Sequence, residues 1–179
     1  SVLIGSKTGM TIHFRLNFNE LRPLGRTARG VKSMNLREGD KLVSMDVLTS
    51  NLVDQLAKFE DSEIVNDGDP ESNSSNGPWV LVASSFGLGK RVPVEQFRLQ
   101  KRAGMGLRAI KFRIKDDVLV GLKVLGKGEE LLFVTEKGVI VRTNADKISQ
   151  QSRAATGVRL QRLDEGDHLS EVVLVPHEQ

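Results

Sequence analysis

Three segments of this 179-residue chain carry the same markers in the same order, and this repetition constrains the fold more than any other feature. The segments run over residues 2–48, 79–125 and 131–175. Each opens with an apolar run, reaches a turn glycine, and then reaches a second glycine that an apolar and a basic residue follow. The turn glycines are Gly9, Gly87 and Gly138, and the second glycines are Gly30, Gly106 and Gly157. Markers in fixed order indicate one structural unit built three times.

The spacing and the local pattern of the repeats predict small antiparallel β-sheets. The second glycines lie 76 and 51 residues apart, and the first spacing falls to 46 when a 30-residue acidic segment is left out. A period of 46–51 residues is the size of one propeller blade. Within each repeat, short runs rich in Val, Leu, Ile and Phe alternate with polar residues and end at glycines, as hairpin strands do.

These observations predict an all-β fold: a partial, propeller-like array of three four-stranded antiparallel blades, with one acidic inserted loop. The first blade covers residues 1–48, the second covers 79–125, and the third, with a C-terminal tail, covers 126–179. A single blade has too little area to bury its own face, so neighbouring blades must stack on it. Three blades cannot close a ring, and open sheet edges invite further pairing. We therefore expect the chain to be part of a longer array or to assemble with other blades.

The segment over residues 49–78 differs in composition from the repeats. It holds seven acidic residues and one basic residue, Lys58, which gives a charge of −6, whereas the rest of the chain carries +9. Leu52, Leu56 and Phe59 follow helical spacing and predict a short helix over 51–59. From residue 61 the composition predicts a disordered loop. We interpret the segment as an insertion that a surface loop tolerates, with an acidic mimic of nucleic acid as the alternative.

Positive charge recurs at corresponding places in the three repeats. A basic, glycine-rich loop precedes each second glycine, and further cations follow both glycines. Stacked blades would repeat these cations along one rim, where Arg forks and glycine amides both suit phosphate oxygens. Because the rim has few aromatic residues for single-stranded bases to stack on, it favours the backbone of a duplex without sequence readout. The predicted contact residues are Arg15, Arg26, Arg29, Lys32, Lys90, Arg91, Lys101, Arg102, Arg108, Arg142, Arg153 and Arg159.

An acidic residue follows each second glycine by ten positions. These residues are Asp40, Asp116 and Asp167. We expect them to lie in hairpin turns and to accept hydrogen bonds from backbone amides, as short acidic side chains do.

The sequence offers no candidate catalytic or metal-binding residues. The chain has no Cys and no Tyr, and its three His residues are scattered, so thiol, tyrosine, triad and metal-centred chemistry have no visible site. No apolar run approaches the ~18 residues of a membrane-spanning helix, and no basic-then-apolar signal opens the chain. We expect no catalytic activity from this chain alone.

Three stretches carry a resemblance to a known family: GRTARGVKSMNLREGD over 25–40, GLGKRVP over 87–93, and residues 148–167. They resemble repeats of the C-terminal DNA-wrapping domain of the DNA gyrase A protein, a β-pinwheel of five or six blades. The resemblance covers nearly all of the chain except 49–78. It implies non-specific binding and bending of double-stranded DNA, in support of ATP-dependent negative supercoiling by the whole enzyme. The order of the repeats resembles the last three blades, and the acidic insertion resembles the plant organellar form.

The resemblance also implies partners, cofactors and a location. The partners would be double-stranded DNA, the remaining blades and the breakage-reunion domain of gyrase A, and the gyrase B protein, with no membrane. ATP and Mg²⁺ would bind elsewhere in the enzyme, and this chain would hold no cofactor. The organellar form would reside in the chloroplast or mitochondrion, and other forms in the cytoplasm or nucleoid.

Two alternatives stay open. The family's first blade carries a box of glutamine, basic residues and glycines, of which Gln100 to Gly106 is a degenerate version with Ala103 and Met105 at two box positions. A topoisomerase IV-like C-terminal domain also lacks a full box. The other alternative is a protein-interaction propeller fragment, which would bind its partner in a salt-insensitive way.

Overall fold

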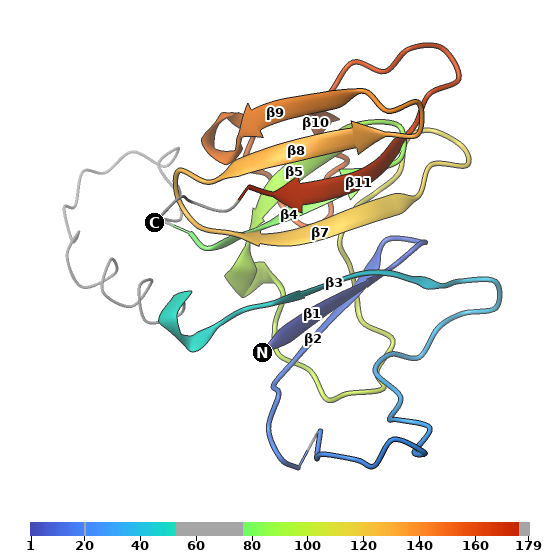
Figure 1. Cartoon of the computed structure of the whole chain (residues 1–179), viewed down its shortest axis with the longest axis vertical. Coiled ribbons are helices and arrows are strands. Elements are labelled where there is room, and N and C mark those ends of the chain that lie inside the picture. Colours follow the sequence, from blue (N-terminus) through green and yellow to red (C-terminus); the bar gives the residue numbers. More distant parts are fainter. Residues whose placement is uncertain (20, 53–76, 176–179) are drawn as a thin grey trace.

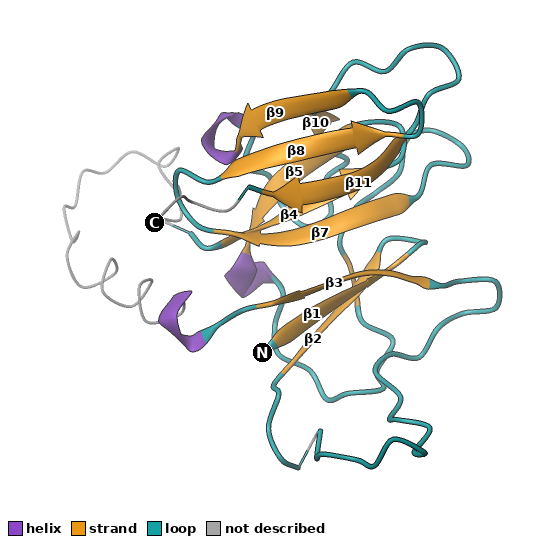
Figure 2. Ribbon diagram, viewed as in Figure 1, coloured by secondary structure: helices purple, strands orange, loops and turns teal. Residues whose placement is uncertain are grey.

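The computed structural model describes residues 1–19, 21–52 and 77–175 and confirms the predicted all-β fold (Figure 2). These residues form eleven strands, which are arranged in three sheets, and two 3₁₀ turns. The elements in chain order are β1 (Val2–Ser6), β2 (Met10–Phe14), β3 (Leu42–Val47), β4 (Trp79–Ser84), β5 (Leu88–Pro93), η1 (Val94–Gln96), β6 (Leu107–Arg108), β7 (Leu119–Leu125), β8 (Glu130–Thr135), β9 (Ile140–Asn144), η2 (Ala145–Lys147), β10 (Val158–Arg159) and β11 (Leu169–Leu174).

Each repeat begins with an antiparallel hairpin, and the predicted turn glycines close these hairpins. The hairpins are β1–β2, β4–β5 and β8–β9. Gly9, Gly87 and Gly138 adopt φ of +81°, +74° and +84°. Residues that carry a side chain rarely adopt this left-handed backbone conformation, so glycine fits the turn.

The fourth strand of a sheet comes from the following repeat. Blade 1 has the order β3-β1-β2-β6, and blade 2 has the order β10-β5-β4-β7. The two-residue strand β6 therefore crosses from the second repeat to pair with β2, and β10 crosses from the third repeat to pair with β5. This exchange corrects the prediction that each repeat folds into its own four-stranded sheet. A two-residue strand carries no local signal for the hairpin it joins, so the sequence did not reveal the exchange.

Close backbone contact explains the second glycine of each crossing segment. A Cβ atom on Gly106 would lie 2.7 Å from the carbonyl oxygen of Thr11, and one on Gly157 would lie 2.5 Å from that of Gly89. Both glycines also adopt positive φ, of +76° and +99°. Any side chain at these positions would push the crossing strand off the preceding blade.

Blade 3 has three strands among the described residues, in the order β11-β8-β9. This differs from the predicted four, because a fourth strand would have to come from a further repeat. The corresponding segment of the first repeat, residues 31–32, is not a strand in this structure.

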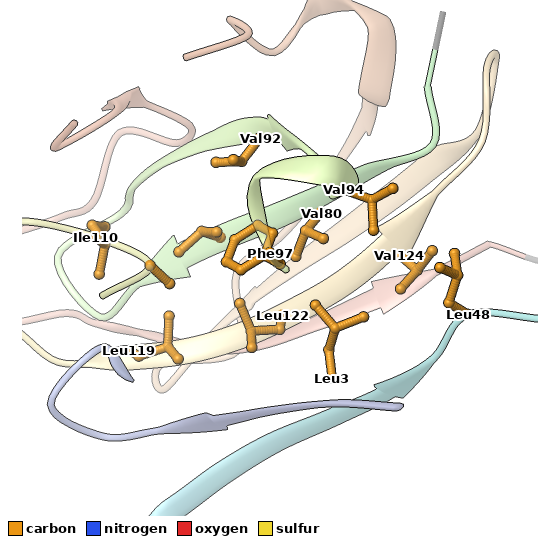
Figure 3. Close-up of a cluster of buried hydrophobic side chains, with 12 residues drawn as sticks. Leu3, Leu48, Val80, Val92, Val94, Phe97, Ile110, Leu119, Leu122 and Val124 are labelled. Atoms are coloured by element: carbon orange, nitrogen blue, oxygen red, sulfur yellow. The ribbon is translucent and has the colours of Figure 1, made fainter. Parts of the chain in front are cut away.

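The blades pack face to face through apolar clusters. Leu3 of β1, Val80 of β4 and Leu122 of β7 meet Phe97 and Ile110 between blades 1 and 2 (Figure 3). A second cluster between blades 2 and 3 holds nine buried residues, Leu81, Ala83, Leu125, Leu131, Phe133, Ala145, Ile148, Leu169 and Val172. Full burial of an aliphatic or aromatic side chain contributes about 1.5–3 kcal/mol, so these interfaces fix the blade arrangement.

Blade 1 also meets blade 2 through polar groups on the facing strands. The backbone N–H of Leu122 donates to the Ser44 hydroxyl at 3.0 Å, and that of Val124 donates to the Asp46 carboxylate at 2.8 Å. The side chains of β3 thus accept hydrogen bonds from backbone N–H groups at the outer edge of β7. This arrangement protects an edge that would otherwise present free backbone groups.

Most of the acidic insertion lies outside the described residues. Residues 50–52 have helical backbone, and the rest of the helix predicted over 51–59, like the loop predicted after it, falls in the segment that the structure does not describe. Among the described residues, no helix has the length and apolar character needed to cross a membrane.

Candidate nucleic-acid interface

The three basic, glycine-rich loops occupy successive places along the molecule, and two of them lie against the preceding blade. They are loop 1 (residues 25–30), loop 2 (residues 101–106) and loop 3 (residues 152–157). Loop 2 begins where the N–H of Gln100 donates to the His13 carbonyl at 2.8 Å. Loop 3 begins in the same way, where the N–H of Gln151 donates to the Arg91 carbonyl at 2.9 Å. Strand exchange therefore sets the places of loops 2 and 3.

Two arginines link loops 2 and 3 to the residues that follow the second glycine of the preceding repeat. The guanidinium of Arg102 donates to the Lys32 carbonyl, and the guanidinium of Arg153 donates to the Arg108 carbonyl. Both arginines stand four residues before the second glycine of their repeat. Arg102 and Arg153 are both half-buried, so part of each side chain still faces solvent.

Lys90 is buried, and this contradicts the prediction that it contacts a phosphate. Its side chain has an exposed fraction of 0%. The ammonium donates to the carbonyls of Ser152, Arg153 and Ala155 at 2.7, 2.7 and 2.6 Å, which uses all three of its protons. Burial, aided by the nearby positive charge of Arg153, lowers the pKa of Lys90 from 10.5 to about 8. Lys90 therefore holds loop 3 in place.

Arg91 is also committed to contacts within the protein. Its guanidinium forms an ion pair with Asp146 at 3.0 Å and lies 4.7 Å above the ring of Trp79. Its Nε also donates to the Ile148 carbonyl at 2.8 Å. Arg142, at the corresponding position of blade 3, is paired with Glu130 at the surface. These pairs leave both arginines weaker candidates for phosphate contact than the sequence predicts.

The other predicted contact residues are exposed to solvent. Lys32 donates from its ammonium to the side-chain oxygen of Asn35 at 2.8 Å, a surface contact that leaves the charge open to an anion. The exposed set is Arg15, Arg26, Arg29, Lys32, Lys101, Arg108 and Arg159.

Three exposed cations meet at one cleft. Arg15, Arg98 and Lys101 line a surface cavity of about 570 Å³, together with Asn17, Leu99, Gln100 and Gly104. None of these lining residues is acidic. Three cations beside the backbone of a glycine loop form a concave site that suits phosphate oxygens.

Sequence reasoning missed Arg98 as a member of this cleft. A signal was present, because Arg98 stands eight residues before its second glycine and Arg22 stands at the same place in the first repeat. The third repeat has Ser149 there, so the recurrence is incomplete.

The aspartates after the second glycines lie in turns, with one correction. Asp40 accepts hydrogen bonds from the N–H groups of Thr8 and Lys41, and Asp167 accepts from those of Lys137 and His168. Desolvation opposes ionisation of Asp40, but hydrogen bonds from Ser6, Thr8 and Lys41 outweigh it and lower the pKa of this carboxyl.

In the second repeat, Asp117 performs this role in place of the predicted Asp116. Asp117 is buried. It accepts hydrogen bonds from the hydroxyl of Ser84, the hydroxyl of Ser85 and the backbone N–H groups of Phe86 and Val118. Asp116 adopts φ of +67°, as Gly39 and Gly166 do at the same place with +76° and +68°. The count of ten residues fails here because this repeat has one residue more before its capping aspartate.

Among the described residues, no group of three His, Asp or Glu side chains is placed to hold a metal ion. The described loops present a series of exposed cations. Backbone contacts hold loops 2 and 3 along the edges of blades 1 and 2. The arrangement suits binding of an extended polyanion.

A family profile described as "DNA gyrase C-terminal domain, beta-propeller" matches residues 1–49, 78–125 and 129–176. The chain belongs to this family. The gyrase A protein of Synechocystis sp. is 52% identical over 182 residues, which cover 98% of this chain and 21% of that protein. The gyrase A protein of Staphylococcus epidermidis is 37% identical over 177 residues, which cover 99% of this chain and 17% of that protein. This gyrase C-terminal domain chain thus spans about a fifth of the length of these relatives.

Solved structures show the same architecture. A DNA gyrase A C-terminal domain aligns with a TM-score of 0.73 at 27% identity, over 97% of this chain and 50% of that one. The C-terminal domain of a DNA topoisomerase IV aligns with the same TM-score at 24% identity, over 97% of this chain and 46% of that one. The second likeness is one of fold alone. The fold does not separate gyrase from topoisomerase IV, whereas the family profile and the 52% identity point to gyrase.

Proposed function

We propose that this gyrase C-terminal domain chain binds the phosphate backbone of double-stranded DNA along loops 1–3 and bends the duplex there. The cleft of Arg15, Arg98 and Lys101 is the observation that carries the proposal, because three cations converge beside glycine backbone with no acidic residue in the described lining. The remaining exposed cations of the set extend the same positive surface along the series of loops.

Binding of this kind requires no chemistry from the protein. Each phosphate that a cation neutralises releases condensed counterions, which supplies affinity without reading the sequence. Bending a 20–30 base-pair site by 40–90° costs of order 1–6 kcal/mol. Several phosphate contacts on successive blades must offset this cost, so the loops have to be held at fixed places. The ammonium of Lys90 and the guanidinium groups of Arg102 and Arg153 provide that rigidity.

In a complete gyrase A protein, the same binding would bend the flanking duplex and present a segment for strand passage. This would support ATP-dependent negative supercoiling by the whole enzyme, with ATP and Mg²⁺ bound outside this chain. The partners would be the remaining blades, the breakage-reunion domain and the gyrase B protein, and the chain would correspond to the last three blades. The relatives are bacterial, which fits a place in the cytoplasm or nucleoid. The plant organellar form, in chloroplast or mitochondrion, stays a prediction from the resemblance.

The test is the affinity of the 179-residue chain for a ~40 base-pair duplex between ~50 and ~200 mM salt. A variant with Arg15→Ala, Arg98→Ala and Lys101→Ala removes the cleft cations. A matched control removes three lysines outside loops 1–3, with Lys127→Ala, Lys137→Ala and Lys147→Ala.

We expect the affinity of the unchanged chain to fall by orders of magnitude over this salt range. Each lost phosphate contact lowers the salt slope by about 0.9, so the cleft variant should lose up to about three units of slope while the control keeps its slope. Equal losses in the two variants would mean that net charge alone drives binding, and the proposed cleft would be wrong. A chain that binds no DNA at low salt but captures a protein partner in a salt-insensitive way would support the protein-interaction alternative.

A further inference from the structure

Three exposed cations that lie outside loops 1–3 follow the crossing strand β6. They are Lys111, Arg113 and Lys115, and they are named here the turn-side patch. Among the described residues, none of their side chains has a hydrogen-bond or ion-pair partner. Asp116 is the one exposed acidic residue between positions 107 and 118, so the segment keeps a net positive charge.

Packing holds the turn-side patch at a fixed place. The side chains of Ile110 and Phe112 pack in the apolar cluster between blades 1 and 2, so the alternating side chains of Lys111 and Arg113 face solvent. The backbone N–H of Lys111 also donates to the Ala155 carbonyl of loop 3 at 3.3 Å. Because its backbone is already ordered, the patch loses little conformational freedom when an anion binds.

The turn-side patch and the cleft lie at opposite ends of one edge of blade 1. The N–H of Gln100, which lines the cleft, donates to the His13 carbonyl, and the N–H of Ala109, two residues before the patch, donates to the Gly9 carbonyl. The segment that carries both groups therefore runs antiparallel to β2 and continues into the loop before β7 (Figure 1). From Gly9 to Arg15 this edge spans roughly 20 Å, at ~3.4 Å per residue.

This separation decides how a duplex can use both groups of cations. It exceeds the width of either groove of B-form DNA, which is ~12 Å for the major and ~6 Å for the minor groove. Loops 1–3 occupy successive places along the molecule, so a duplex that follows them crosses the edge of blade 1 instead of running along it. The cleft and the turn-side patch then face the backbones on the two sides of a groove, which belong to different strands.

The corresponding place on blade 2 carries acidic residues instead. Counted from the second glycine of each repeat, Arg162 stands where Lys111 does, but Asp164 stands in place of Arg113 and Glu165 follows it. Both acidic side chains are exposed. They would repel a phosphate, so a basic patch at this place is a feature of the blade 1 edge and not of every repeat.

We propose that the turn-side patch is a second phosphate-binding site, which contacts one strand of a duplex while the cleft contacts the other strand. The inference rests on the proposed function, because it requires the duplex to lie along loops 1–3. It adds contacts that neither the cleft nor the loops supply. Contacts to both strands restrict rotation of the duplex about its own axis at blade 1, which contacts to one strand do not.

The first test compares salt slopes on the ~40 base-pair duplex. A patch variant carries Lys111→Ala, Arg113→Ala and Lys115→Ala, and the three-lysine variant described above is the matched control. Each lost phosphate contact lowers the slope by about 0.9, so the patch variant should lose up to about three units and the control none. A variant that lacks both the patch and the cleft cations should lose the sum of the two separate losses. Equal urea unfolding midpoints would show that all these variants fold.

The outcomes of this test separate the two proposals. A patch variant with an unchanged slope, beside a cleft variant with a lowered one, would overturn this inference and leave the proposed function in place. If the same patch variant also lost binding of a polyglutamate peptide, the patch would belong to an acidic protein partner instead. A chain that binds no duplex at low salt would overturn both proposals.

The second test asks whether the two groups of cations contact different strands. Methylphosphonate linkages make one strand of the duplex uncharged and keep its base pairing. The unchanged chain should then lose up to about three further units of slope, because the cleft and the patch can no longer both meet a charged strand. The patch variant should lose much less, since its cleft needs one charged strand only. The lower charge of this duplex weakens both chains alike, so equal losses would mean that both groups contact the same strand and would overturn the proposal.

Discussion

Replacement of the buried lysine gives the sharpest test of how the basic loops are held. In Lys90→Met the apolar stem of the side chain is kept and the three donors are lost. The carbonyls of Ser152, Arg153 and Ala155 remain, at places where the ammonium now lies 2.6–2.7 Å away. Replacement of a buried charge by an apolar residue is harmless only where its partners are replaced too, and here the three acceptors stay.

The magnitude follows from these acceptors. An acceptor left without a donor costs about 1–3 kcal/mol when water cannot reach it. Ser152 is exposed, and Arg153 and Ala155 are half-buried, so loop 3 can turn part of its backbone toward water and recover some of the cost. We expect the free energy of unfolding to fall by about 2–3 kcal/mol, chiefly because loop 3 loosens from blade 2.

The assay is urea unfolding followed by the fluorescence of Trp79, the single tryptophan of the chain. Its indole N–H donates to Gln150 at 2.6 Å and its ring lies under Arg91, so it reports on the corner where loop 3 begins. Lys101→Met is the control, because Lys101 is exposed and a surface change of this kind stays within about 0.5 kcal/mol. A Lys90→Met chain as stable as that control would refute the reasoning that Lys90 anchors loop 3.

Three further predictions concern stability. Because burial lowers the pKa of Lys90 from 10.5 to about 8, the unfolded chain binds a proton between these pH values that the folded chain does not. The free energy of unfolding, relative to that of Lys90→Met, should therefore rise with pH over this window, and urea titrations that give a flat difference would contradict this. Gly157→Ala should lower the free energy of unfolding by at least about 2 kcal/mol, since its Cβ would lie 2.5 Å from a carbonyl oxygen. Gly128→Ala is the control and should lower it by about 1 kcal/mol, because Gly128 also has positive φ but faces open space. Equal shifts of the melting temperature in the two variants would contradict the close-contact argument. Asp117→Ala should lower the free energy of unfolding by about 2–4 kcal/mol, because its hydrogen bonds are lost. Asp116→Gly should raise it by about 0.5–1 kcal/mol, because glycine adopts the φ of +67° without strain. Chemical unfolding of both variants measures these changes.

Sequence markers predict the parts of this fold that are local. The turn glycines close hairpins because a tight turn between neighbouring strands needs a left-handed residue, and that requirement acts within a few residues of Gly9, Gly87 and Gly138. The alternation of apolar residues likewise predicts strands whatever their partners are. The number of repeats, the all-β fold and the place of the basic loops follow from such local signals.

Strand exchange could not be predicted from the same signals, because pairing partners are not a local property. Strand β6 has two residues, and its own sequence does not say whether it joins the hairpin before or after it. The buried lysine did leave a signal. Lys90 is the third residue after its turn glycine, where the other repeats have Ile12 and Val141, so alignment of the repeats places it on an inward-facing position.

Strand exchange also links the proposed DNA surface to the blade junctions. Loop 2 lies on blade 1 through the hydrogen bond from Gln100 to His13, and loop 3 lies on blade 2 through that from Gln151 to Arg91. The chain segments that would hold phosphates are therefore the same segments that join one blade to the next. A change that loosens a junction should displace the cations of one loop relative to those of its neighbours, even when no cation is replaced. Because a bent duplex must contact several loops together to offset its elastic cost, we expect bending to be lost before binding as the junctions weaken.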